Sequence, residues 1–391
     1  MTLVLFGFAA FCLFAASHPF VTYPLSLWAL RRVRFQPIAS DAWDSLPRPT
    51  TFSICVCAYN EASVIERTIV NLLKLRESAE DVQILMYVDG ATDGTAEIAR
   101  RYEDRIDLVV SEERCGKNYG LNELTKRVRG DIVVLIDANT EIAPDALVNL
   151  GRYFTDPSVG CVCGHLLFVN ADETVTAETG SLYWRLEEHI KQLESEIGSA
   201  MGADGSLYAF RWQYIRTVPY GVADDMYLSL SILCDGLRVV RADDVRAFER
   251  SASSANDEFR RKIRIACQGF SAHKALWPRL RKLDALTVYQ YVSHKLLRWF
   301  TAPILFCAFA FALMGVAVAL GTPWAIAVGI GVVLLFWGGN VAGWRLFTTV
   351  IDILQAFVAT AIGVHRSLNG TVVGTWEPAG SVRVNTREVR Q

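Results

Sequence analysis

Carboxylate and amide side chains recur in three short segments, VDGATDGT (88–95), LIDANT (135–140) and VADDMYLSL (222–230). The aspartates of the first two follow apolar runs that predict β-strands, and open α/β sheets bind ligands at the carboxyl ends of their strands. Asp137-Ala138-Asn139 places two oxygen ligands on one tight turn, which suits Mg²⁺ or Mn²⁺. A cation held there would neutralise charge on a departing phosphate. Taken alone, both residues would equally fit ordinary turn positions.

The elements that must position these residues alternate between strand and helix. Apolar runs predict strands at residues 52–58, 83–89, 108–111 and 132–137, with a further β-rich run at 158–169. Helical spacing of apolar residues predicts helices at 62–75, 95–102, 119–128 and 173–196. This alternation predicts an α/β fold, with a mainly parallel sheet and helices on both faces. A glycine-rich turn, MGADGSLYAFR (201–211), follows the last helix.

Composition predicts a soluble domain joined to membrane segments. The chain has 391 residues, of which 52% are hydrophobic and 20% charged, and its mean hydropathy is +0.24. A formal net charge of −2 excludes a nucleic-acid partner. Nine cysteines fit reduced intracellular thiols better than a disulfide framework. The pairs Cys55-x-Cys57 and Cys161-x-Cys163 fit core packing better than a zinc site, because each pair lies on one face of a strand.

The N-terminal 30 residues predict a transmembrane helix (1–30). Residues 2–30 contain no Asp, Glu, Lys or Arg, and this uncharged stretch is long enough to span a bilayer. We expect Pro19 and Pro24 to kink or end this helix. A cleaved signal peptide is the alternative, but the segment has no basic start. Arg31, Arg32 and Arg34 indicate that the following linker (31–50) and domain are cytosolic.

The C-terminal third predicts further membrane segments. Basic and aromatic residues interleave in 251–299, which predicts amphipathic helices at the membrane interface; a soluble helix packed on the domain is the alternative. Two stretches without formal charge, separated at Gly321, predict a transmembrane hairpin (300–345). Segment 346–366 carries Asp352 and Gln355, so it predicts either a span or an interfacial helix. Arginines in the tail (367–391) favour a cytosolic C-terminus. We therefore expect a multi-pass protein of the inner (plasma) membrane.

The ordered set of motifs from residue 51 to 265 resembles the catalytic domain of the family 2 inverting glycosyltransferases. The family includes membrane-bound synthases of bacterial exopolysaccharides, chitin-like oligosaccharides and hyaluronan. The resemblance implies a GT-A fold, covering a little over half of the chain. It also implies a Mg²⁺ or Mn²⁺ cofactor and a UDP-sugar donor.

The resemblance also implies roles for individual residues. Ala58, Asn60 and Glu61 match the opening motif that cradles the nucleoside, and Asp89 matches the residue that pairs with uracil. Lys117 matches a lysine near the diphosphate. Asp137 and Asn139 occupy the metal-binding D-x-D positions. Ala223-Asp224-Asp225 resembles the T-E-D motif, which makes Asp225 the general base and Asp224 a substrate-binding neighbour. Substrate contacts are also implied for three further residues, Gly202, Asp204 and Arg264.

Three departures from the family pattern bear on function. Asn139 stands where a second carboxylate is usual, and a neutral amide is a weaker ligand. T-E-D is replaced by A-D-D. The Q-x-x-R-W signature of processive synthases is reduced at residues 261–265, where Arg264 remains but Ile265 replaces Trp. Losing that aromatic platform for a sugar favours transfer of a single sugar.

We therefore expect a membrane-bound enzyme that moves one sugar from a UDP-sugar to a lipid-linked or glycan acceptor, in exopolysaccharide or glycolipid biosynthesis. Export or polysaccharide-assembly proteins are expected partners. Two alternatives remain: a processive polysaccharide synthase, and a catalytically silent nucleotide-sugar-binding scaffold of a synthase complex.

Overall fold

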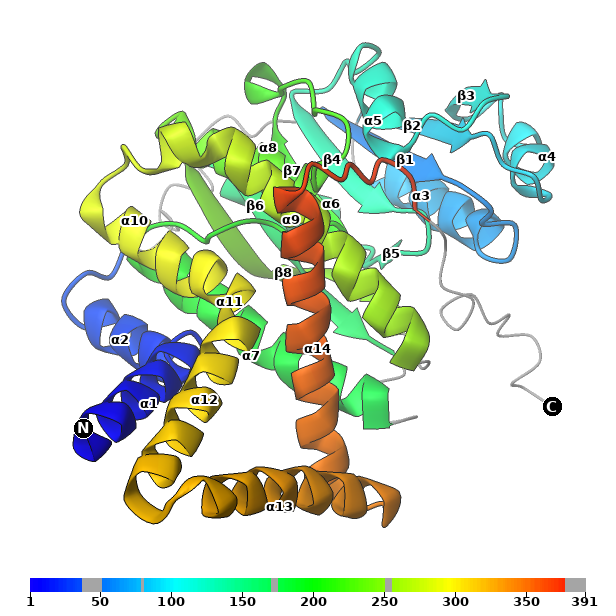
Figure 1. The fold of residues 1–391 in the computed structure, drawn as a ribbon. Helices are drawn as coiled ribbons and strands as arrows, with labels where there is room; N and C mark the ends of the chain where they lie inside the picture. Colours follow the sequence, from blue (N-terminus) through cyan, green and yellow to red (C-terminus); the bar gives the residue numbers. More distant parts are fainter. Residues whose placement is uncertain (37–50, 79–80, 170–174, 250–254, 377–391) are drawn as a thin grey trace.

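The computed structural model describes residues 1–36, 51–78, 81–169, 175–249 and 255–376. Figure 1 shows an α/β domain in the upper part of the view and a group of apolar helices below it. The chain starts in the lower group and builds the α/β domain. It then returns to the lower group before its last described residues run back over the α/β domain.

The α/β domain contains an eight-stranded sheet with the order β3-β2-β1-β4-β7-β6-β8-β5. The strands are β1 (Phe52–Ala58), β2 (Val82–Asp89), β3 (Asp107–Ser111), β4 (Ile132–Asp137), β5 (Glu141–Ile142), β6 (Val159–Phe168), β7 (Leu207–Arg211) and β8 (Arg238–Glu249). The first four are parallel, whereas β7 runs antiparallel to both β4 and β6. The predicted α/β class is confirmed, but the sheet is mixed rather than mainly parallel because β7 enters its middle in the opposite direction.

Alternate side chains of the strands build one apolar core on each face of the sheet. Ile54 and Val56 belong to the core covered by α3 (Ile65–Ser78), α4 (Thr95–Arg100) and α6 (Ala146–Tyr153). Cys55 and Cys57 belong to the core covered by α5 (Lys117–Thr125), α8 (Asp224–Cys234) and α9 (Ala255–Leu280). Cys161 and Cys163 are also fully buried there. The expectation that both cysteine pairs pack in the core is confirmed.

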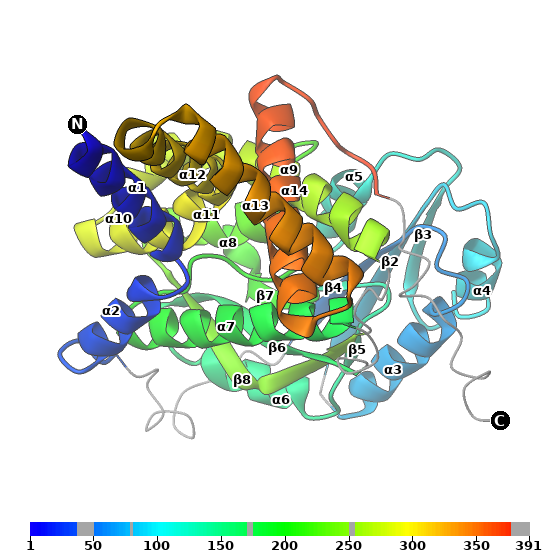
Figure 2. The ribbon, with the colours of Figure 1, turned by 60° about the horizontal axis from the view of Figure 1, so that its bottom comes forward.

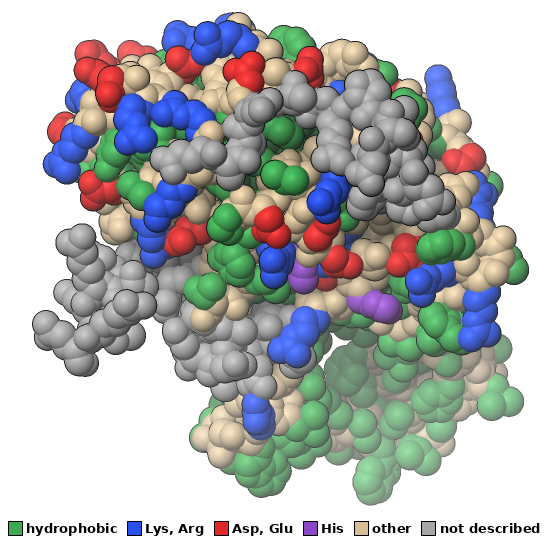
Figure 3. Space-filling model, turned by 180° about the vertical axis from the view of Figure 1, so that it is seen from behind, with side chains coloured by type: hydrophobic (Ala, Val, Ile, Leu, Met, Phe, Trp, Pro, Cys, Tyr) green, Lys and Arg blue, Asp and Glu red, His purple; other side chains and the backbone are tan. Residues whose placement is uncertain are grey.

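The lower group contains long helices whose apolar side chains face outward. Its members are α1 (Thr2–Ser17), α2 (Thr22–Arg31), α12 (Thr301–Leu320), α13 (Thr322–Val341) and α14 (Arg345–Leu368). Three of them, α12, α13 and α14, are long and apolar enough to cross a membrane, and α1 with α2 would add a fourth span bent by 57°. The bend lies beside Pro19, as predicted. In Figure 3 hydrophobic side chains dominate this part of the surface, whereas charged side chains cover the α/β domain.

The two helices of the predicted hairpin do not lie side by side. They meet at Gly321, but Figures 1 and 2 show α13 crossing between the lower ends of α12 and α14. The partner that packs along α12 is α1, where the rings of Phe8 and Phe311 stack at 5.5 Å. Whether these helices span a bilayer stays a prediction.

A buried ionic cluster joins the α/β domain to the lower helices. It lies between α7 (Val175–Ile197) and the segment formed by α10 (Ala285–Tyr291), the π-helical turn Val292–Leu296 and α11 (Leu297–Trp299). His294 is fully buried and contacts Glu187 at 2.9 Å through Nε2 and Glu194 at 2.8 Å through Nδ1. Lys295 donates to Glu187 at 2.9 Å. Carboxylates on α7 therefore fix the segment that leads into α12.

The C-terminal part of the chain packs on the α/β domain. Helix α14 packs along α9, and a Cβ atom at Gly363 would collide with the backbone of Ile263. Residues 371–376 then cross the edge of the sheet near β4 and β1 (Figure 1). Gln268 on α9 donates to the carbonyl of Val373 at 2.8 Å. Helix α9 thus packs against the domain on one side and α14 on the other, while the position of a membrane surface beside it stays a prediction.

Candidate active site

The loops that follow β1 and β2 are tied to each other by side chains. Asn60, with a positive φ of 52°, accepts a hydrogen bond from the backbone N–H of Thr92 at 2.8 Å. The carboxylate of Asp93 accepts from the backbone N–H groups of Ala62 and Thr95, each at 3.0 Å. Both loops lie at the carboxyl ends of adjacent parallel strands, where an open sheet binds ligands.

Asp89 connects this pair of loops to a third one. Its side chain is fully buried and accepts from the backbone N–H of Cys115 at 2.7 Å and of Gly116 at 2.9 Å. Gly116 has a φ of 94°, which favours glycine, and directly precedes α5. The carboxylate of Asp89 thus shapes the loop that presents Lys117. The contact of Asp89 with uracil stays a prediction.

Lys117 brings together the carboxylates that lay far apart in the sequence. Its ammonium lies 2.8 Å from Asp137 at the end of β4 and 3.2 Å from Asp224 at the start of α8. Asp137 remains 37% exposed, so one face of its carboxylate is open to a ligand. Burial alone would lower the pKa of Lys117, but Asp137, Asp224 and Asp225 raise it far above its usual value. The lysine therefore stays charged.

Asp225 lies in the first turn of α8, directly after Asp224. Burial and the adjacent Asp224 raise the pKa of Asp225 to about 7, against the opposing effect of Lys117. Its Oδ1 accepts the backbone N–H of Met226 at 2.6 Å. Asp224 instead accepts the hydroxyl of Tyr208 at 2.9 Å and pairs with Lys117. Two neighbouring aspartates thus have different environments, and the pKa of Asp225 suits a general base at neutral pH.

Gly202, Asp204 and Gly205 lie in the turn before β7, and this turn approaches the carboxylates. A Cβ atom at Gly205 would lie 3.3 Å from Oδ2 of Asp225 and 3.8 Å from Oδ2 of Asp137. Arg264, on α9, interacts electrostatically with the same two carboxylates, while burial and Arg261 lower its pKa. The structure therefore brings Lys117, Asp137, Asp224, Asp225 and Arg264 to one site.

Asn139 faces a residue that the sequence analysis missed. Its side-chain amide is buried and donates to Glu249 Oε1 at 2.7 Å, and Ser206 donates to Oε2 of the same residue at 3.1 Å. Glu249 ends β8, more than 100 residues after Asn139. No motif marked it. Only the pairing of β8 with β6 and β5 brings its carboxylate to the end of β4.

The segment 371–376 is a second contribution that the sequence did not reveal. Gly374 abuts Gly116, and Val372 abuts Gly221, just before Asp224. The ring centres of Trp376 and Tyr59 lie 5.9 Å apart, and the guanidinium carbon of Arg114 lies 3.7 Å from the ring centre of Tyr59. The sequence analysis places these residues in the tail (367–391) and predicts no contact between them and the site. They instead border the loops after β1 and β3.

The arrangement of the sheet and its covering helices is that of a GT-A fold. Residues 53–214 match the family model "Glycosyl transferase family 2". The chain therefore contains a family 2 glycosyltransferase domain, as the resemblance of its motifs implied.

Named relatives and one solved structure agree with this assignment. An N-acetylglucosaminyltransferase of Rhizobium sp. (strain N33) is 23% identical over 250 residues, covering 60% of this chain and 54% of the relative. A poly-beta-1,6-N-acetyl-D-glucosamine synthase of Staphylococcus aureus (strain COL) is 27% identical over 191 residues, covering 47% and 46%. The chain thus spans about half the length of these curated relatives.

Among solved structures, the mannosyltransferase PcManGT of Pyrobaculum calidifontis, in complex with GDP-Man and Mn²⁺, has a similar fold. The TM-score is 0.70 at 24% sequence identity, and the match covers 93% of this chain and 99% of that one. This similarity extends the likeness of fold beyond the residues that the family model matches.

Gly205 offers a direct test of the site. In Gly205→Ala the added methyl group would crowd Asp225 and come into contact with Asp137, so we expect the turnover rate to fall by about 10-fold or more without unfolding. Gly198→Ala is the matched control, because a Cβ atom there meets open space. Turnover and thermal unfolding should be measured for both. Equal turnover in the two variants would contradict the placement of substrate beside Gly205.

Proposed function

We propose that this protein is a membrane-associated inverting glycosyltransferase that moves one sugar from a UDP-sugar to a lipid-linked or glycan acceptor, in exopolysaccharide or glycolipid biosynthesis. The observation that carries the proposal is the cluster in which Lys117 lies between Asp137 and Asp224, with Asp225 beside it. Within 4 Å of a Cβ atom at Gly205, this cluster offers Asp225 as a base together with Asp137 and Lys117, which would lie at the diphosphate.

Asp225 is the proposed general base. It would take the proton from an acceptor hydroxyl while that oxygen attacks the anomeric carbon on the face opposite the departing nucleotide. The bond to the nucleotide breaks as the new glycosidic bond forms, so a single displacement inverts the anomeric centre. Lys117 and Arg264 would offset the negative charge of the departing diphosphate.

The residues at the end of β4 fit a divalent cation. Asp137 has an open carboxylate face, and Asn139 and Glu249 add oxygen atoms from the neighbouring turn and strand. Oxygen ligands of this kind suit Mg²⁺ or Mn²⁺. Within the described residues no three acidic, histidine or cysteine side chains converge as a ready cage, so phosphate oxygens would have to complete the ligand set. Such a cation would supply positive charge at the leaving diphosphate.

Glu249 is our proposed replacement for the carboxylate that Asn139 lacks. The family pattern would place a second acidic side chain at position 139, whereas here a neutral amide lies 2.7 Å from the carboxylate of Glu249. Net negative charge near the cation is thereby kept although the motif has changed. This explains how Asp137-Ala138-Asn139 can serve a metal-dependent reaction.

The nucleoside would lie at the loops after β1, β2 and β3. Ala58 and Asp89 end β1 and β2, and Asn60 and Glu61 lie in the loop after β1. Tyr59, Arg114 and Trp376 supply aromatic and cationic surface beside them. We retain UDP as the proposed nucleotide, and N-acetylglucosamine as the first sugar to test, because two relatives bear that name. GDP-mannose is the competing donor, because PcManGT was solved with it.

The apolar helices support a membrane location. Three helices have the length and hydropathy of spans, and we propose a multi-pass protein of the inner (plasma) membrane with its catalytic domain in the cytosol. A lipid-linked acceptor would then lie within reach of the site. Proteins that export or assemble the product are proposed partners.

The test of the proposed function is release of UDP or GDP from a panel of nucleotide-sugars. The purified protein in detergent should be assayed with UDP-N-acetylglucosamine, UDP-glucose, UDP-galactose and GDP-mannose, with Mg²⁺ or Mn²⁺ and with or without a bacterial lipid extract. We expect one donor to react, and only with both metal and lipid present. A long product would support a processive synthase, whereas nucleotide binding without release under any condition would support a silent scaffold.

The pH dependence of turnover tests the base. Because burial and Asp224 raise the pKa of Asp225 to about 7, its proton-accepting form is scarce below that pH. We expect kcat/KM to rise about tenfold per pH unit below 7 and to level off above it. Asp225→Asn should abolish turnover yet retain nucleotide binding. An acid limb near pH 4, or an active Asp225→Asn variant, would remove Asp225 from this role.

Binding of Mn²⁺ tests Glu249. Glu249→Gln keeps the shape of the side chain but removes its charge, so we expect Mn²⁺ affinity in the presence of UDP to fall by about 10-fold or more. Glu103→Gln, at an exposed position, is the control. Electron paramagnetic resonance measures the free Mn²⁺, so this test does not depend on turnover. Equal affinities in the two variants would exclude Glu249 from the metal site.

A further inference from the structure

The turn at residues 202–205 forms one wall of the space between the base and the leaving group. Gly205 lies within 4 Å of carboxylate oxygens of both Asp225 and Asp137, measured from the position of a Cβ atom. If Asp225 activates the acceptor and Asp137 lies at the diphosphate, the sugar being transferred must lie between them. The backbone of this turn is therefore the surface against which that sugar packs.

Three side chains hold the turn from behind. Glu194, on α7, accepts the backbone N–H of Met201 at 2.9 Å. Ser229, on α8, accepts the backbone N–H of Ala203 at 3.1 Å and donates to the carbonyl of Asp225 at 2.6 Å. The third is Lys191, also on α7, whose ammonium contacts the carboxylate of Asp204. Two of these contacts fix Ala203 and Asp204 within the turn, and the third fixes Met201 directly before it.

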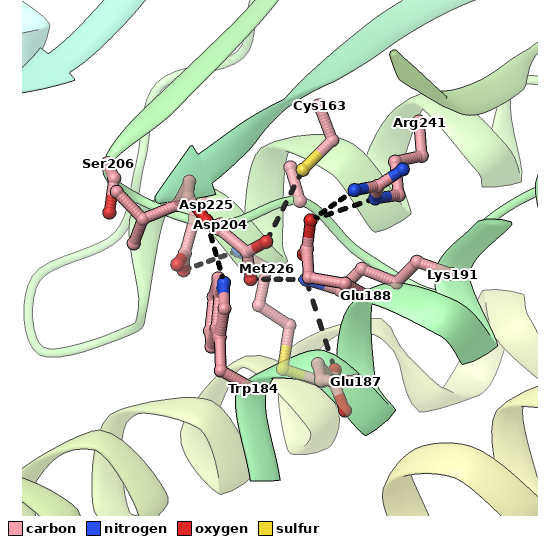
Figure 4. Close-up of polar contacts among 12 residues, drawn as sticks. Cys163, Trp184, Glu187, Glu188, Lys191, Asp204, Ser206, Asp225, Met226 and Arg241 are labelled. Carbon is pink, nitrogen blue, oxygen red and sulfur yellow. Dashed lines mark hydrogen bonds and ion pairs between the residues drawn. The ribbon is translucent and has the colours of Figure 1, made fainter. Parts of the chain in front are cut away.

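The carboxylate of Asp204 is directed toward α7. Its Oδ1 contacts Lys191 and its Oδ2 accepts from the thiol of Cys163 at 3.5 Å. Figure 4 shows it lying between these two side chains. Its side chain is only 16% exposed. Both oxygens are thus engaged beneath the turn, so the implied substrate contact of Asp204 is better assigned to the backbone that it anchors.

Lys191 is the cation on which Asp204 depends. Its side chain has no exposed surface, and it lies 3.9 Å from Glu187 and 5.3 Å from the ring centre of Trp184. Glu187 has other cationic partners in Lys295 and Arg298. In the described part of the chain, Asp204 pairs with no cation other than Lys191.

The protonation of Lys191 is consistent with this arrangement. Burial would lower its pKa, but Asp204 and the neighbouring groups Cys163, Glu187 and Glu188 hold that pKa well above its usual value. The lysine is therefore charged, and its removal would leave a buried carboxylate without a counter-ion. A turn anchored in this way loses its fixed position when either partner is removed.

We propose that Lys191 and Asp204 are a positioning pair that holds the backbone of residues 202–205 against the sugar of the donor, without either side chain binding that sugar. The inference rests on the proposed function, because it takes the sugar to lie between Asp225 and Asp137. It assigns Lys191 a part in sugar recognition although its side chain lies wholly beneath the site.

The pair predicts separate effects on nucleotide and nucleotide-sugar binding. In Lys191→Met the turn loses its anchor, whereas the loops at the nucleoside are untouched. We expect the Kd for UDP-N-acetylglucosamine to rise about 10-fold and the Kd for UDP to change less than about 2-fold, with kcat lower by about 10- to 100-fold. GDP-mannose and GDP form the second pair of probes. Isothermal titration calorimetry measures the Kd values of all four compounds, whether or not the protein turns over the two nucleotide-sugars.

Matched variants separate positioning from simple loss of stability. Arg241→Met removes another buried cation that pairs with α7, through Glu188, but does not touch the turn. We expect it to lower thermal stability while keeping the ratio of the two Kd values. Asp204→Asn should reproduce the effect of Lys191→Met, and the double variant should be no worse than either single one, because both act through one interaction. Asp204→Asn also serves if Lys191→Met does not fold.

Each outcome bears on a different claim. Equal changes in both Kd values, or none, would overturn the positioning pair. So would multiplied losses in the double variant, which would indicate that Asp204 binds the sugar independently of Lys191. A wild-type protein that binds the nucleotide-sugars but never turns them over would refute the proposed function. The ratio of Kd values would then still decide the inference about Lys191.

Discussion

The position of one ammonium group, that of Lys117, determines whether the active site can exist at all. Asp137 ends β4, whereas Asp224 and Asp225 begin α8, and like charges brought together where water is scarce repel strongly. Lys117 lies 2.8 Å from the first and 3.2 Å from the second, which offsets that repulsion. Under the proposed function, the same ammonium would also offset the charge of a bound diphosphate.

Lys117 owes its position to a buried residue that need not touch substrate. Asp89 accepts two backbone N–H groups of the loop before α5, and Gly116 adopts the positive φ that lets the helix start there. Loss of Asp89 would leave these donors buried without a partner. The carboxylate of Asp89, at the end of β2, thus shapes the site, whereas the resemblance implied only a contact with uracil.

The sequence predicted best what depends on neighbours in the chain. The apolar runs that became β2 and β4 placed Asp89 and Asp137 correctly at strand ends, because strand periodicity and turn residues are local signals. Helix α5 was predicted from residue 119 but begins at Lys117, so its N-terminal turn was missed.

Contacts between distant residues could not be predicted in this way. Glu249 reaches Asn139 only through the order of strands in the sheet. The sequence analysis gave Lys191 no role, because nothing local shows that α7 is covered on that side by the turn at Asp204. Trp376 lay in a stretch without periodicity, and its contact with Tyr59 depends on the path of α14.

The path of α14 also sets the order in which parts of the protein can fold during synthesis. Domains generally fold from the N-terminus as the ribosome releases them, and every strand of the sheet precedes α12. The segment 371–376, however, follows the three apolar helices and closes against Gly116 and Gly221. A nascent chain would therefore hold a folded sheet but an unfinished nucleotide pocket until its apolar helices had left the ribosome. Maturation of the pocket would then be coupled in time to delivery of those helices to a bilayer.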